Sequence, residues 1–149
     1  MSLAVDVAAD GVRAPLGRTR AAAIASSALR AENVRNAMLS IAFVTNARIA
    51  GINRRHLGRR GATDVISFGF RRPRASDPVV GDIYIAPDVA RVHAREVGVR
   101  LRDEVARLIV HGVLHVLGYD HPERAGRLES AMWRRQEAIL ARIATGSPS

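Results

Sequence analysis

Residues 110–121 read VHGVLHVLGYDH and hold three of the chain's five histidines, His111, His115 and His121, at the spacing H-x3-H-x5-H. On a helix, positions i and i+4 lie one turn apart on the same face, so the rings of His111 and His115 can hold one ion between them. A continuing helix would carry the third histidine away. Gly118 supplies the break, because glycine just past a helix end adopts the left-handed conformation that other residues resist. The stretch therefore predicts a helix, a turn and a third ring folded back over the first two.

Three neutral imidazoles, without a cysteine or an evident fourth protein ligand, are typical of an open, catalytic Zn2+ site in which the remaining position holds water. The alternative is a set of ordinary core histidines. The segment 108–117 is apolar on nearly every side, however, and an unpaired polar group buried there costs roughly 1–3 kcal/mol. A shared metal ion satisfies both rings of the helix, so we predict a metal site.

The pattern HG-x-LH-x-x-GYDH over residues 111–121 resembles the signature of the YbeY family, bacterial metal-dependent endoribonucleases implicated in ribosomal RNA maturation. The same histidine spacing occurs in the metzincin peptidases, H-E-x-x-H-x-x-G-x-x-H. Gly112 stands where such a peptidase needs its glutamate general base, so the sequence does not support peptidase chemistry.

Three further blocks are similar to the YbeY family in the same order: IN-x-x-H over residues 52–56, TDVISF over residues 63–68 and GDI over residues 81–83. The last predicted helix, with Met132 and Glu137, also fits, and the correspondence runs nearly without gaps from about residue 38 to 140. The resemblance implies an α+β fold, a small mixed sheet of about four strands covered by about five helices, with a zincin-like metal helix and turn at one end of a cleft.

The resemblance also implies a function. It indicates zinc-dependent endonucleolytic cleavage of single-stranded RNA in rRNA processing, namely maturation of the 3′ end of the small-subunit rRNA, and in ribosome quality control. The expected partners are rRNA and, with it, ribosomal subunits or assembly factors.

One departure from the family pattern affects the catalytic residues. Family members often carry an arginine implicated in catalysis at the position that is Leu57 here, while Ala62 replaces a usual proline and Arg60 a usual aspartate. That arginine therefore cannot be assigned by position. Arg55 and Arg59 are the candidates to reach the same phosphate, on the ground of proximity alone.

The hydrophobic periodicity along the chain agrees with an α+β fold. The segment 37–45 is apolar on both faces, which predicts a central strand. The last helix is expected to turn Leu128, Ala131, Met132, Ile139 and Ile143 inward, and residues 145–149 to form a disordered tail. Strands are predicted near residues 3–10, 37–45, 63–70 and 79–86, and helices near residues 19–31, 46–56, 87–97, 102–117 and 124–144.

Length and composition predict one globular domain over residues 1–149. The absence of cysteine excludes disulfides and thiolate metal sites, and there is neither an apolar run long enough to span a membrane nor a secretory signal, so a cytoplasmic location is expected. The net charge is +9, and all 23 basic residues are arginine, whose planar fork pairs with phosphate. Genomic base composition could explain the choice of arginine over lysine, but it explains the net excess less well.

The sequence leaves three functions to compare. A metal-dependent nuclease without a glutamate at position 112 must pass its proton to Asp120, to the substrate or to solvent, and Asp120 could instead orient a histidine ligand. The second candidate is an RNA-binding ribosome-assembly factor in which zinc only braces the turn at Gly118. The third is a metallopeptidase, which Gly112 disfavours.

Overall fold

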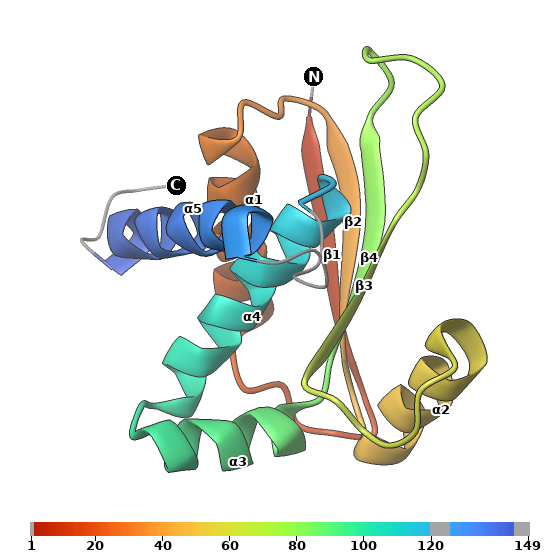
Figure 1. Ribbon diagram of the computed structural model, residues 1–149, viewed down its shortest axis with the longest axis vertical. Coiled ribbons are helices and arrows are strands. Elements are labelled where there is room, and N and C mark those ends of the chain that lie inside the picture. The colour runs from red at the N-terminus through yellow and green to blue at the C-terminus, as the bar shows by residue number, and fades with distance from the viewer. Residues whose placement is uncertain (1, 120–125, 145–149) are drawn as a thin grey trace.

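The computed structural model describes residues 2–119 and 126–144, and the side chains of residues 126–130 lie outside that description (Figure 1). These residues form four strands and five helices, which agrees with the predicted α+β class. They follow one another as β1 (Leu3–Asp10), α1 (Arg18–Ala31), β2 (Ala37–Val44), α2 (Asn46–Leu57), β3 (Val65–Gly69), β4 (Val79–Ile85), α3 (Pro87–Val97), α4 (Leu101–Val116) and α5 (Gly126–Ala144).

The four strands form one mixed sheet in the order β1-β2-β4-β3. Strands β1, β2 and β4 run parallel, and β3 pairs antiparallel with β4 at the edge of the sheet. The central position predicted for residues 37–45 is confirmed, since β2 pairs on both sides. The segments before and after edge strand β3 are both rich in arginine.

Helices α1, α4 and α5 lie on one face of the sheet and α2 lies on the other (Figure 1). Alternate residues of β2 serve the two faces: Leu39 and Ile41 join the large core beneath α1, α4 and α5, whereas Val44 joins a smaller cluster with Ile49 and Ile52 of α2. This alternation is what the two-residue period of a strand requires. None of the described helices is both long and apolar enough to cross a bilayer.

The carboxyl-terminal half of α4 lies directly on the sheet, and glycines make this approach possible. A Cβ atom at Gly69 of β3 would lie 2.6 Å from the backbone oxygen of Val116. A Cβ atom at Gly112 of α4 would lie 2.9 Å from Cγ2 of Ile83 in β4. These close contacts hold the histidine-bearing turns of α4 against β3 and β4.

The inward face predicted for the last helix is partly wrong. Met132, Gln136 and Ile139 are buried, whereas Ala131 is exposed. A stripe at spacings of four and three residues faces α4 and α1, and Ala131 lies one position away from it. Ile143 is half-buried, and the predictions for Leu128 and for residues 145–149 fall outside the described residues.

Candidate metal centre

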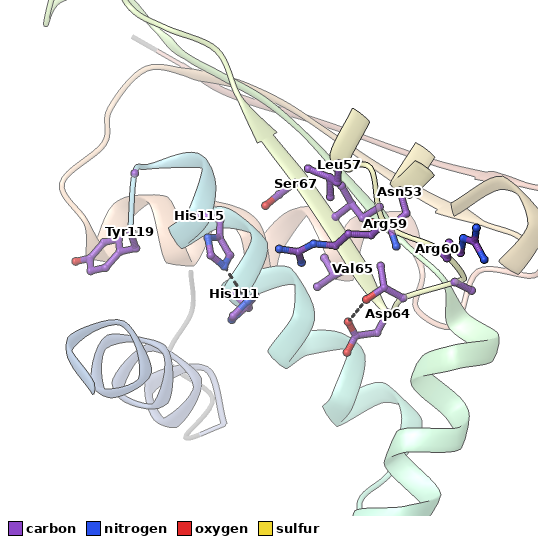
Figure 2. Close-up of a pocket in the computed structure, with 14 residues that line it drawn as sticks. Asn53, Leu57, Arg59, Arg60, Asp64, Val65, Ser67, His111, His115 and Tyr119 are labelled. Atoms are coloured by element: carbon purple, nitrogen blue, oxygen red, sulfur yellow. Dashed lines mark hydrogen bonds between the residues drawn. The ribbon is translucent and has the colours of Figure 1, made fainter. Parts of the chain in front are cut away.

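His111 and His115 converge as the i, i+4 spacing predicts. Their Nε2 atoms lie 3.0 Å apart, and their ring centroids are 4.5 Å apart with the ring planes at 74° (Figure 2). Zinc-nitrogen bonds are about 2.0–2.1 Å long, so a single ion can contact two nitrogens at this separation. The geometry of this pair fits a shared metal ion.

Gln136 contacts one ring nitrogen of His111 and leaves the other facing His115. Nδ1 of His111 lies 2.8 Å from Oε1 of Gln136, a buried side chain of α5. A carbonyl oxygen only accepts, so with this amide orientation Nδ1–H donates to it and the neutral ring keeps its lone pair on Nε2. Metal-bound histidines are commonly fixed through their second nitrogen in this way.

The turn after α4 forms where the sequence predicts it. Gly118 has φ of 100°, and the backbone N–H of Tyr119 donates to the carbonyl oxygen of Leu114 at 3.0 Å. The Tyr119 hydroxyl then donates to Oε1 of Glu32 at 2.6 Å, and this hydrogen bond, together with burial, raises the pKa of Tyr119. The phenol therefore remains protonated at neutral pH.

The remaining residues of the motif cannot be compared with the structure. His121 and Asp120 lie outside the described residues. Among the residues whose side chains are described, no group of three histidine, cysteine, aspartate or glutamate residues could hold a metal ion. The assignment of His111, His115 and His121 as a ligand set therefore stays a prediction.

A cavity of about 700 Å³ opens beside the two histidines. Figure 2 shows the Arg59 side chain extending toward the histidine pair, whereas Arg60 points away from it. Among the described residues that line the cavity, Arg59 is present and Arg55 is not. The lining comes from the end of α2 and the following loop (Asn53, Leu57, Arg59, Arg60, Ala62, Thr63, Asp64), from β3 (Val65, Ile66, Ser67) and from α4 and its turn (His111, His115, Gly118, Tyr119).

Asn53 ties the arginine loop to α2. Its side-chain amide donates to the carbonyl oxygen of Gly61 at 3.0 Å, and its backbone carbonyl oxygen accepts from the backbone N–H of Arg59 at 3.3 Å. The Asn53 side chain itself is buried. Asn53 therefore holds the loop that carries Arg59 at two points, Arg59 and Gly61.

The position of Gly112 argues against a peptidase. The Cβ contact with Ile83 means that a side chain at position 112 would point into the sheet and not into the cavity. A general-base glutamate at this position would meet β4. The histidine spacing of the peptidases is present here without their catalytic base.

A family model described as endoribonuclease YbeY matches residues 13–144. The chain belongs to the YbeY endoribonuclease family. Members of the YbeY family are metal-dependent nucleases, hydrolases that act on RNA phosphodiester bonds, and RNA is accordingly the class of substrate. The resemblance found in the motifs is thereby confirmed, and the matched residues include His111, His115, Arg59 and Gln136.

Relatives from distant bacteria support the assignment. An endoribonuclease YbeY from Anaeromyxobacter sp. is 37% identical over 137 residues, which cover 89% of this chain and 69% of the relative. One from Pelotomaculum thermopropionicum is 39% identical over 147 residues, covering 95% of this chain and 90% of the relative. The solution structure of TM1509 from Thermotoga maritima shares the fold with a TM-score of 0.62 at 17% identity, over 97% of this chain and 94% of that one.

Sequence reasoning missed three residues that support the candidate metal centre from outside the cavity. Gln136 contacts His111, and Glu32 contacts both Tyr119 and Arg135. The available signal was a glutamine on the buried stripe of the last helix, since a buried amide needs a partner.

Proposed function

We propose that this chain is a zinc-dependent endoribonuclease that cleaves single-stranded RNA in rRNA processing, including maturation of the 3′ end of the small-subunit rRNA, and in ribosome quality control. The observation that carries the proposal is the convergence of His111 and His115, with Nε2 atoms 3.0 Å apart, in a cavity lined also by Arg59. Membership of the YbeY family supports the class of substrate.

In this proposal, His111, His115 and His121 hold the ion. The donor set fits zinc, because the described pair offers imidazole nitrogens and Gln136 keeps the lone pair of His111 on Nε2. When bound, zinc would supply a Lewis acid that polarises a phosphoryl oxygen and lowers the pKa of a water molecule to roughly 7.

The other residues of the cavity bind and orient the RNA. Arg59 reaches toward the histidines, so its guanidinium is proposed to pair with the phosphate that is attacked and to stabilise the charge that develops there (Figure 2). Because Gly112 removes the peptidase base, the carboxylate of Asp120 is the proposed acceptor of the proton that the attacking oxygen loses.

The setting of the reaction is part of the same proposal. The RNA is rRNA within ribosomal subunits or their assembly intermediates, and the protein acts in the cytoplasm, where these particles mature. The net charge of +9 supports contact with a polyanion.

The test compares His115→Ala with His93→Ala. His93 lies on α3 outside the cavity, where its Nδ1 contacts Glu104 at 2.9 Å. We expect His115→Ala to lose bound zinc and cleavage of an unstructured RNA, and His93→Ala to keep both, with metal measured by elemental analysis and cleavage measured with and without chelator.

Two results would contradict the proposal. One is cleavage retained by His115→Ala. The other is stoichiometric zinc and tight RNA binding in the unaltered chain without any chelator-sensitive cleavage, which would indicate an RNA-binding factor braced by a structural metal.

A further inference from the structure

Two adjacent residues of α5 reach two different parts of the metal centre. Gln136 accepts a hydrogen bond from Nδ1 of His111 at 2.8 Å, and Arg135 contacts Glu32, which in turn accepts from the Tyr119 hydroxyl. No described residue of α5 lines the cavity. These side chains therefore act on the site from outside the cavity, through the residues that they hold.

Glu32 joins three separate segments of the chain. Its carboxylate accepts from the Tyr119 hydroxyl at 2.6 Å and from Nε of Arg135 at 2.7 Å, with a second bond from Nη2 of Arg135. The same Nη2 donates to the carbonyl oxygen of Ala31 at 3.1 Å, at the end of α1. The Glu32 side chain is only 12% exposed, so water competes weakly for these bonds.

The network restrains the backbone where the motif leaves α4. Tyr119 follows Gly118, whose left-handed conformation ends the helix, and it precedes Asp120 and His121 in the chain. A short segment anchored at its first residue has fewer conformations open to it than a free one. Anchoring Tyr119 thus lowers the entropic cost of ordering His121, the proposed third ligand.

We propose that Gln136 and the Arg135–Glu32 pair are positioning residues of the metal centre, with Gln136 fixing the coordinating nitrogen of His111 and the pair fixing the turn through Tyr119. The inference rests on the proposed metal site. It assigns to α5 the role of positioning the residues that hold the ion. It predicts that metal affinity depends on side chains that touch neither the ion nor the RNA.

The test measures cobalt and zinc binding directly. Co2+ replaces Zn2+ in such sites, and the intensity of its visible absorption reports the coordination geometry. We expect Tyr119→Phe, Arg135→Ala and Gln136→Met each to weaken metal binding about 10- to 100-fold in a chelator competition and to alter the cobalt spectrum. Gln136→Glu keeps an oxygen acceptor for Nδ1–H and should retain the wild-type affinity.

Arg102→Ala is the control, because it removes the same charge from an exposed position in the first turn of α4, away from the cavity lining. It should leave metal affinity unchanged. Tyr119→Phe and Arg135→Ala should also be non-additive when combined, since both act through Glu32.

Thermal unfolding of the metal-free variants separates positioning from folding. Lower unfolding temperatures with wild-type metal affinity and an unaltered cobalt spectrum would overturn the inference and leave the proposed function intact. If the unaltered protein binds neither metal, both fail.

Discussion

At the scale of single residues, Arg59 differs from the other arginines near it in where its side chain lies. Arg55 belongs to the last turn of α2 and does not line the described cavity, whereas Arg59 follows the helix end on a loop held by Asn53. Figure 2 shows Arg59 extending toward the histidine pair. The two candidates lie four residues apart, and the end of the helix separates them.

Replacing Arg59 by alanine should lower the rate of RNA cleavage roughly 100-fold, the loss typical of removing one donor to a developing oxyanion. Arg55→Ala and Arg100→Ala should have smaller effects, because Arg55 lies outside the cavity lining and Arg100 pairs with Asp103 at the start of α4. The measurement is the single-turnover rate at saturating RNA. Equal losses in all three variants would contradict this role.

A second substitution gives a control for that result. Leu57 also lines the cavity, at the position where the family resemblance expects an arginine. Leu57→Arg introduced into Arg59→Ala should therefore restore part of the rate, while Leu57→Arg alone should add little.

The residues of the site were predictable to the extent that they are close in sequence. The pairing of His111 and His115 follows from helix geometry, which fixes neighbours at i and i+4. The contact between His111 and Gln136 spans 25 residues and depends on how α4 packs against α5, which no local pattern specifies. That Arg59 lines the cavity and Arg55 does not likewise depends on where α2 ends.

At the scale of elements, the site depends on how closely α4 approaches β3. Gly69 faces the backbone of Val116, one residue after His115, and Gly112 faces Ile83. Backbone atoms cannot move aside as a flexible side chain can. The absence of side chains at these glycines sets the distance between the histidines and the cavity wall formed by β3.

Gly69→Ala should destabilise the fold by roughly 1–3 kcal/mol, since an added Cβ would overlap the Val116 carbonyl and push α4 from the sheet. Gly51→Ala is the control: its Cβ meets no atom within 4 Å, and alanine in a helix interior stabilises by up to about 1 kcal/mol. Denaturant unfolding measures both effects. A Gly69→Ala protein as stable as the wild type would show that α4 does not depend on this contact.

The elements themselves were largely predictable because their periodicities are strong. Strand β2 was predicted as central from apolar residues on both faces, and a helix was predicted near residues 46–56. Helix α2 begins at Asn46, after the Thr45 hydroxyl, which accepts from the backbone N–H of Arg48. The inward face of α5 was less well predicted. Alanine contributes little to periodicity, so Ala131 could not be assigned to either side of the buried stripe.

At the scale of the whole molecule, positive charge gathers at both ends of β3. The loop before β3 carries Arg59 and Arg60, and the hairpin after it carries Arg71, Arg72 and Arg74, all exposed. Figure 1 shows the hairpin projecting beyond the body of the protein, with α2 and α3 at the other end. Because β3 also contributes to the cavity wall, a strand of RNA that follows β3 would pass the histidines between two basic loops.

Removing Arg71 and Arg74 should therefore weaken binding of longer single-stranded RNA and lower its salt dependence. Each lost phosphate contact reduces the slope of log K against log salt by about 0.7, so the double alanine variant should lose roughly 1.4. Arg72 is left in place, because its guanidinium donates to the carbonyl oxygens of Ala75 and Asp77 and holds the hairpin. Arg18→Ala with Arg20→Ala removes the same charge from the exposed first turn of α1, which packs on β1 at the opposite edge of the sheet from β3, and should barely change the slope. Equal changes in both double variants would mean that RNA responds to total charge and not to a path along β3.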